Sequence, residues 1–105
     1  MDTLESRIYS IQDKCDLNIS ILLSDSSHPV FKAHFPGQPI LPGFIQLEIA
    51  STVFEYTYSG IKKSKFIKPI YPEDVLTFVA QLKEENLRVK IYRKQEIVTD
   101  FILIS

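Results

Sequence analysis

Three prolines lie close together, directly before the most apolar helical pattern in the chain. Pro36, Pro39 and Pro42 each fix their own φ angle and disfavour helix in the preceding residue. We therefore expect a stiff, extended connector that leads straight into a helix. An imidazole, His34, and a carboxylate, Glu48, bracket this segment. A stiff connector holds such side chains still, so the segment is the first place to look for a functional site.

The helical pattern runs from Phe44 to about Tyr58 and leaves only a narrow polar stripe. Such a pattern is typical of a helix that is buried on most sides. Ser59 and Gly60 are expected to end it. The apolar positions that define the pattern are Phe44, Ile45, Leu47, Ile49, Ala50, Val53 and Phe54.

The rest of the chain reads as strands. Leu87, Val89 and Ile91 alternate with polar neighbours, which is typical of a strand with one face in water. Strands, then one apolar helix, then consecutive strands joined by short turns predict an α+β fold in which an antiparallel sheet curls around a helix. We see no repeat or linker, so we expect a single domain over residues 1–105. The predicted strands cover about residues 7–11, 16–24, 65–70, 75–82, 87–93 and 97–104.

Composition narrows the classes of function. The chain has 105 residues, 45% of them hydrophobic and 24% charged, with a formal net charge of −1, so its overall charge gives no reason to expect nucleic acid. The N-terminus lacks the pattern of a signal peptide, and no apolar run approaches the roughly 18 residues of a membrane span. We expect a cytoplasmic protein without a membrane partner. Because small domains bury little surface, association with another subunit would help stability.

Residues 34–48, HFPGQPILPGFIQLE, closely resemble the active-site motif of the hotdog-fold 3-hydroxyacyl-[acyl-carrier-protein] dehydratases of the FabZ and FabA type. Residues 66–74, FIKPIYPED, resemble the strand and turn that follow the helix in the same family. The likeness covers roughly residues 28–104. Only residues 59–64 connect the helix to the second motif, and this short connection is more similar to dehydratases of aryl polyene or other specialised lipid pathways.

The resemblance implies a hotdog fold and a lyase that dehydrates (3R)-hydroxyacyl thioesters on acyl carrier protein to trans-2-enoyl thioesters. His34 is suited to remove a C2 proton, because neutral imidazole is available near neutral pH. Glu48 would protonate the leaving hydroxyl, if burial keeps it protonated, or would hold the water that does so. The Gly43 N–H, at the helix start, would polarise the thioester carbonyl.

The same resemblance implies that the substrate contacts Phe35, Pro36, Pro42 and Phe44. No metal or redox cofactor is implied, since phosphopantetheine arrives as part of the substrate. Sequence proximity does not bring Glu48 back to its own His34, because the intervening extended residues span up to about 26 Å. In the family, histidine and acid come from different subunits. We therefore expect a homodimer or a larger assembly of dimers, or a heteromer with another hotdog subunit.

Lys62, Lys63 and Lys65 belong to the only concentrated charge in the chain. Acyl carrier proteins are acidic, so these lysines are candidates for carrier docking. Lysines also commonly protect an exposed strand edge, and this second interpretation stays open.

Alternatives remain for the site and for the function. Without the motif, Glu48 belongs to a polar stripe with Ser51, Thr52 and Glu55 that would simply face solvent. His28 is interpreted as a loop histidine with a backbone partner. A hotdog acyl thioesterase would share the fold, and so would a non-catalytic hotdog subunit that binds acyl carriers or pairs with an active dehydratase.

Overall fold

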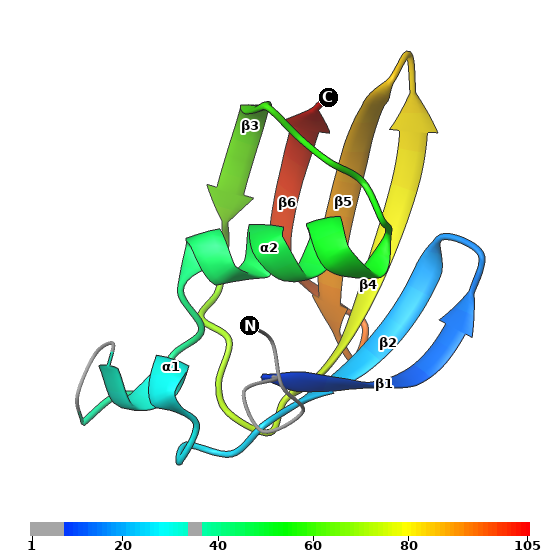
Figure 1. Ribbon diagram of the computed structural model, residues 1–105. Helices are drawn as coiled ribbons and strands as arrows, with labels where there is room; N and C mark the ends of the chain where they lie inside the picture. The colour runs from blue at the N-terminus through cyan, green and yellow to red at the C-terminus, as the bar shows by residue number, and fades with distance from the viewer. Residues whose placement is uncertain (1–7, 34–36) are drawn as a thin grey trace.

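The computed structural model describes residues 8–33 and 37–105, in which an antiparallel sheet curls around a helix (Figure 1). Six strands form the sheet in the order β1-β2-β4-β5-β6-β3, and every neighbouring pair is antiparallel. This arrangement confirms the predicted α+β class. The elements are β1 (Tyr9–Cys15), β2 (Asn18–Leu23), α1 (Pro29–Ala33), α2 (Gly43–Val53), β3 (Gly60–Phe66), β4 (Val75–Lys83), β5 (Asn86–Arg93) and β6 (Glu96–Ile104).

One face of the sheet forms the core. Leu87, Val89 and Ile91 of β5 are buried, whereas Arg88 between them is exposed, as the alternation predicts. The same alternation in the adjoining strands gives the sheet an apolar inner face against α2 and a polar outer face. The largest fully buried side chains are Phe31, Phe78, Phe101, Ile19, Ile21, Leu23, Ile70, Leu76, Ile91 and Leu103.

Helix α2 lies across the inner face of the sheet (Figure 1). Its side chains at Leu47, Ala50 and Val53 are buried, while Glu48 and Thr52 remain exposed. The helix is therefore exposed to solvent along one narrow stripe, as its sequence pattern predicts.

The predicted end of this helix was wrong, because α2 stops at Val53 instead of near Tyr58. The N–H of Tyr56 donates to the carbonyl of Ser51 (2.9 Å), and the N–H of Glu55 donates to that of Thr52 (3.2 Å). These two bonds form a Schellman ending in which Glu55 takes the left-handed position, with φ 52°. Glycine usually fills that position, so no residue at this point of the chain indicates that the helix ends.

Strand β3 was also predicted too late in the chain. It covers Gly60–Phe66 instead of residues 65–70, and it begins at the glycine that was expected to end the helix. Its lysine-rich sequence does not look like a strand, because lysine is depleted in sheets. The strand lies at the sheet edge and pairs only with β6 among the described residues. A bulge between Ile61 and Lys63 twists this edge, a common protection for an exposed strand.

A short helix, α1, was missed in the sequence. It begins at Pro29, and proline is a favoured first residue of a helix. The Nδ1 atom of His28 accepts a hydrogen bond from the N–H of Val30 (3.0 Å), which gives His28 the backbone partner expected for it. Neither described helix is long and apolar enough to cross a membrane.

A buried hydrogen-bonded side chain joins α2 to the sheet. Gln46 is only 3% exposed, and its Oε1 accepts a hydrogen bond from Thr99 Oγ1 of β6 (2.7 Å). Its Nε2 donates to the carbonyl of Leu41 (3.2 Å). A buried polar group is costly unless it is paired, so these contacts determine how the helix sits on the sheet.

Replacing Thr99 with valine should therefore lower the free energy of unfolding by about 1–3 kcal/mol, because the Gln46 oxygen would stay buried without a donor. Urea unfolding of the wild type and Thr99→Val measures the difference. Thr77→Val is the matched control, since Thr77 contacts Ser20 where the contact is only partly buried. Equal losses in the two variants would contradict the special role of the Gln46 contact.

Candidate active site

Three of the predicted site residues, His34, Phe35 and Pro36, lie outside the described residues. Helix α1 ends at Ala33, directly before these three residues. Directly after them, Gly37 has a φ of 86°, a left-handed conformation that favours glycine.

The helix start expected to polarise a carbonyl is formed by Pro42 and Gly43. Pro42 caps α2 in an extended conformation, and its carbonyl accepts hydrogen bonds from the N–H groups of Ile45 (3.1 Å) and Gln46 (3.3 Å). As the first residue of α2, Gly43 has an N–H with no acceptor inside the helix. The positive end of the helix dipole adds to this N–H, so the site attracts a developing negative charge.

An apolar hollow of about 370 Å³ opens beside this helix start. The ring of Phe66, at the end of β3, packs so closely on Gly43 that a Cβ atom added there would lie 2.6 Å from the ring. Any side chain at position 43 would therefore have to displace the Phe66 ring. The hollow is lined by Ile40, Leu41, Pro42, Gly43, Gln46, Phe66, Ile67, Lys68 and Pro69.

A second hollow, of about 360 Å³, adjoins the first and shares Ile40 and Pro69 with it. This second hollow is lined by residues 38–40 together with Pro69, Tyr71 and Pro72. The N–H of Leu41 donates to the carbonyl of Ile70 (2.8 Å). The two sequence motifs that carried the family resemblance are thus held together in space. Phe44, predicted to contact substrate, does not line either hollow and is 57% exposed.

Glu48 lies on the exposed stripe of α2 and not in the hollow beside Gly43. Glu48 is exposed in the single chain, so the burial that its direct role as an acid would need is not found there. Its Oε2 atom instead accepts a hydrogen bond from the hydroxyl of Tyr58 (2.8 Å). That bond, together with burial and the charge of Glu48, raises the pKa of Tyr58 above its usual value. Sequence reasoning missed Tyr58 because it placed this residue at the end of the helix.

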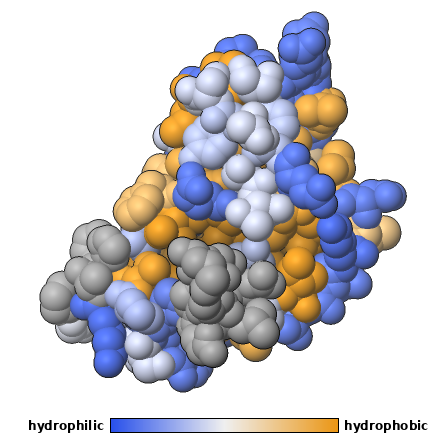
Figure 2. Space-filling view, viewed as in Figure 1, coloured by the Kyte–Doolittle hydropathy of each residue, from blue (hydrophilic) through white to orange (hydrophobic). Residues whose placement is uncertain are grey.

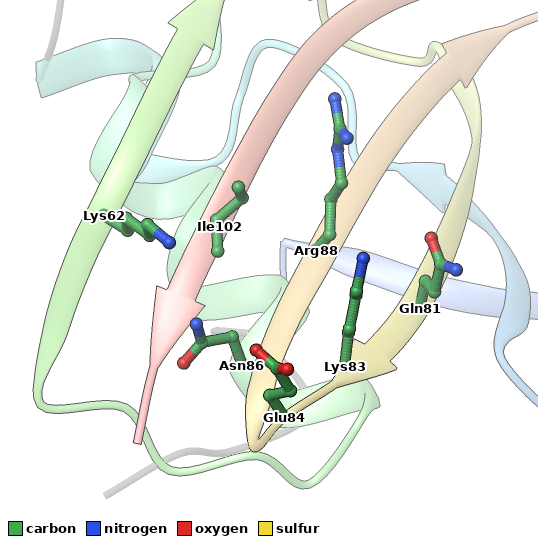
Figure 3. A pocket seen from close by; sticks show the side chains of 7 residues that line it. All are labelled: Lys62, Gln81, Lys83, Glu84, Asn86, Arg88 and Ile102. Carbon is green, nitrogen blue, oxygen red and sulfur yellow. The ribbon is translucent and has the colours of Figure 1, made fainter.

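The three lysines predicted as candidates for carrier docking, Lys62, Lys63 and Lys65, lie on the edge strand β3. Lys63 and Lys65 pair with Ile102 and Asp100 of β6, on the outer face. The basic patch formed by Lys62, Lys63 and Lys65 therefore lies on the opposite side of the sheet from α2. Lys62 is one of the residues that line a hollow of about 300 Å³ on this face, and Figure 3 shows their side chains. The other residues around it are Gln81, Lys83, Glu84, Asn86, Arg88 and Ile102.

The outer face carries more positive than negative side chains. Arg88 forms an ion pair with Asp100 (2.9 Å), which lowers the pKa of Asp100. Lys62, Lys63 and Lys65 have no ion pair among residues 8–33 and 37–105. Within the same ranges no cluster of three or more histidine, cysteine, aspartate or glutamate residues is suited to hold a metal ion.

The model of the ApeI-like family, described as ApeI dehydratase, matches residues 10–100. The chain belongs to this family. Among curated relatives, FabZ dehydratases of Desulfotalea psychrophila and Polynucleobacter necessarius are 29% and 34% identical over 90 and 80 residues. These matches cover 71% and 64% of the chain, but only 60% and 52% of the relatives.

Solved structures confirm the hotdog fold of this ApeI-like chain. The dehydratase heterocomplex ApeI:P from Xenorhabdus doucetiae gives a TM-score of 0.70 at 24% identity, covering 90% of this chain and 92% of the other. An uncharacterised protein from Erwinia carotovora gives a TM-score of 0.62 at 25% identity, covering 90% and 88%.

The contact between Gly43 and Phe66 predicts a compensating pair of substitutions. Gly43→Ala should lower the free energy of unfolding by about 1–2 kcal/mol, because the new methyl group displaces the Phe66 ring. The loss should largely vanish when Gly43→Ala is made in a Phe66→Ala background. Thermal unfolding of the four variants measures both values.

Gly60→Ala is the control for this pair, since an added Cβ atom at Gly60 meets open space. Gly60→Ala should change the free energy of unfolding by less than about half of the change caused by Gly43→Ala. An undiminished loss from Gly43→Ala in the Phe66→Ala background would show that the close contact is not the cause.

Proposed function

We propose that this chain is a dehydratase of (3R)-hydroxyacyl thioesters carried on acyl carrier protein, with trans-2-enoyl thioesters as products. The observation that carries the proposal is the glycine at the start of α2, which presents a helix N-terminus to an apolar hollow. Membership of the ApeI-like dehydratase family supports the reaction class. The hollow is lined mainly by aliphatic, proline and aromatic side chains, which suits an acyl chain or its thioester linkage.

The reaction breaks a C2–H bond and the C3–O bond, and it forms a double bond between C2 and C3. His34 takes the C2 proton, and the thioester oxygen gains negative charge as the proton leaves. The Gly43 N–H stabilises that charge. Glu48, or a water that it holds, gives a proton to the departing 3-hydroxyl, which leaves as water. No resident cofactor is required, since no electrons are exchanged with a third component.

The proposed site is shared between two subunits. In the single chain Glu48 points to solvent, and Phe44 on the same stripe of α2 is exposed. The nearby edge strand β3 exposes Ile61 (47%) and Phe66 (48%). Figure 2, viewed from the α2 side, shows hydrophobic surface across the middle of this face. A second hotdog subunit seated here would cover these side chains and bring its own histidine to Glu48.

The partner in this assembly is a second copy of the chain or a different hotdog subunit. The second possibility is favoured by the similar fold of the dehydratase heterocomplex ApeI:P. In that case the chain is one subunit of a heteromer, and its homodimer is inactive or weakly active until the other subunit is added. A thioesterase activity has no comparable observation in its favour.

Acyl carrier protein is the proposed docking partner of the basic outer face. Lys62, Lys63 and Lys65 are exposed on the edge strand. An acidic carrier would be steered to them by long-range attraction. Its flexible pantetheine arm would carry the acyl group from this face to the hollow.

The direct test is an assay of the purified protein with 3-hydroxyacyl carriers of different chain lengths, following the enoyl product. His34→Ala and Glu48→Ala should each lower kcat/KM by about 100-fold or more, and the double variant by far less than the product. Thr52→Ala, one turn after Glu48 on the same exposed stripe, is the matched control and should stay close to wild type.

Mixing the two inactive variants tests the shared site. An exchanged heterodimer combines both defects in one site and leaves its other site intact. An equimolar mixture should therefore recover about one quarter of wild-type activity, since about half of the dimers are mixed and each has one working site. If His34 and Glu48 acted within one chain, the mixture would stay inactive. If only a second hotdog protein restores the wild type, the chain is a heteromer subunit.

Charge reversal tests carrier docking. The triple variant Lys62→Glu, Lys63→Glu and Lys65→Glu should raise KM about 10-fold for a substrate on acyl carrier protein, and far less for the same acyl group on pantetheine. Only the carrier has the long-range negative field. Added salt should imitate the substitution, because exposed charges are screened over about 8 Å at physiological ionic strength.

A control triple variant keeps the same net charge change at exposed positions elsewhere: Lys14→Glu, Lys32→Glu and Lys94→Glu. The KM of this control variant for a substrate on acyl carrier protein should change much less than that of the β3 triple variant. Equal effects of the two triple variants would show that net charge, and not the outer face, governs carrier binding.

A further inference from the structure

The early end of α2 brings a tyrosine onto the candidate catalytic carboxylate. Had the helix continued to Tyr58, that residue would lie about 15 Å further along the helix axis than Glu48. Instead the chain reverses at Glu55, and the Tyr58 hydroxyl donates to Glu48 Oε2 at 2.8 Å. The contact thus depends on a helix stop that no glycine or proline signals.

The returning segment is anchored on both sides of Tyr58. Before it, the Tyr56 hydroxyl shares its one proton between the main-chain carbonyls of Glu85 and Leu103. Ser51 Oγ donates to the Tyr56 carbonyl (2.7 Å). After it, the N–H of Ser59 donates to the Ile104 carbonyl (2.7 Å). These bonds tie the segment to the β4–β5 turn and to the end of β6. Tyr58 is therefore held by the sheet as well as by the helix.

We propose that Tyr58 is a positioning residue, which holds the Glu48 carboxylate in place for the dehydration. This inference rests on the proposed function. An exposed glutamate samples many side-chain conformations, and a misplaced catalytic group lowers the rate strongly. The Tyr58 hydroxyl occupies Oε2 and so leaves Oε1 for the 3-hydroxyl of the substrate or for a bound water.

The raised pKa of Tyr58 is consistent with this role. Its first cause is the hydrogen bond to Glu48, followed by burial and the negative charge of the carboxylate. Because each cause favours the protonated phenol, Tyr58 remains a hydrogen-bond donor across the pH range in which a dehydratase works.

Tyr58→Phe removes the donor and keeps the ring. We expect kcat to fall about 10-fold while KM changes less than about twofold, because the hydroxyl acts through Glu48 and not on the substrate. In a Glu48→Gln background the same substitution should change kcat less than about twofold. Tyr92→Phe removes a hydroxyl on the outer face of β5 and should leave kcat unchanged in both backgrounds.

Tyrosine titration tests the pair without any substrate. Tyr58 should lose its proton at higher pH than an ordinary tyrosine, and Glu48→Gln should move the pKa of Tyr58 down, seen as an earlier rise in phenolate ultraviolet absorbance. Wild-type kcat in Tyr58→Phe, equal effects in both backgrounds, or a titration unchanged by Glu48→Gln would each overturn the inference. A wild type that titrates as expected but dehydrates no carrier substrate, either alone or with a second hotdog subunit, would refute the proposed function instead.

Discussion

The hydrogen bonds of Gln46 determine how the rest of the site is arranged. A helix turns about 200° over two residues, so a side chain at Gln46 that faces the sheet puts Glu48 almost on the opposite side. The same amide holds the Leu41 carbonyl, and with it the path of the chain into Gly43. One buried group thus sets the helix rotation and the start of the helix together. Because a buried amide without partners is costly, other rotations of α2 are strongly disfavoured.

The side chains of β3 alternate between the two faces of the sheet, so the strand contributes to the proposed acyl site on one face and to the proposed carrier-binding surface on the other. Phe66 pairs with Thr99 on the inner face and covers Gly43, whereas Lys65, the preceding residue, pairs with Asp100 on the outer face. An apolar hollow for the acyl group and a basic surface for its carrier are therefore built from adjacent residues. The exposed edge between the two faces is the surface on which we propose that a second hotdog subunit sits.

Sequence reasoning succeeded where periodicity is strong and failed where backbone geometry decides. The strands β4, β5 and β6 alternate between buried and more exposed side chains, and each predicted range differs from the observed one by a single residue at one end. The end of α2 was missed because Glu55 occupies a left-handed position that glycine usually fills, so no glycine marks the end of the helix. The range of β3 was predicted wrongly because lysines are untypical of strands. This edge strand is stabilised by its pairing with β6, which the local sequence does not indicate. Gln46 gave no local signal, since its partner Thr99 is far along the chain.

The sequence by itself determined the fold class, the family and the residues expected to react, because fixed spacing and alternation are local properties of the chain. The tertiary structure alone decided which residues meet. It brought Phe66 onto Gly43, Thr99 onto Gln46 and Tyr58 onto Glu48. Each of these contacts depends on a chain reversal or on strand pairing between distant segments. Their geometry follows from packing and buried hydrogen bonds across the whole sheet, and no local pattern records it.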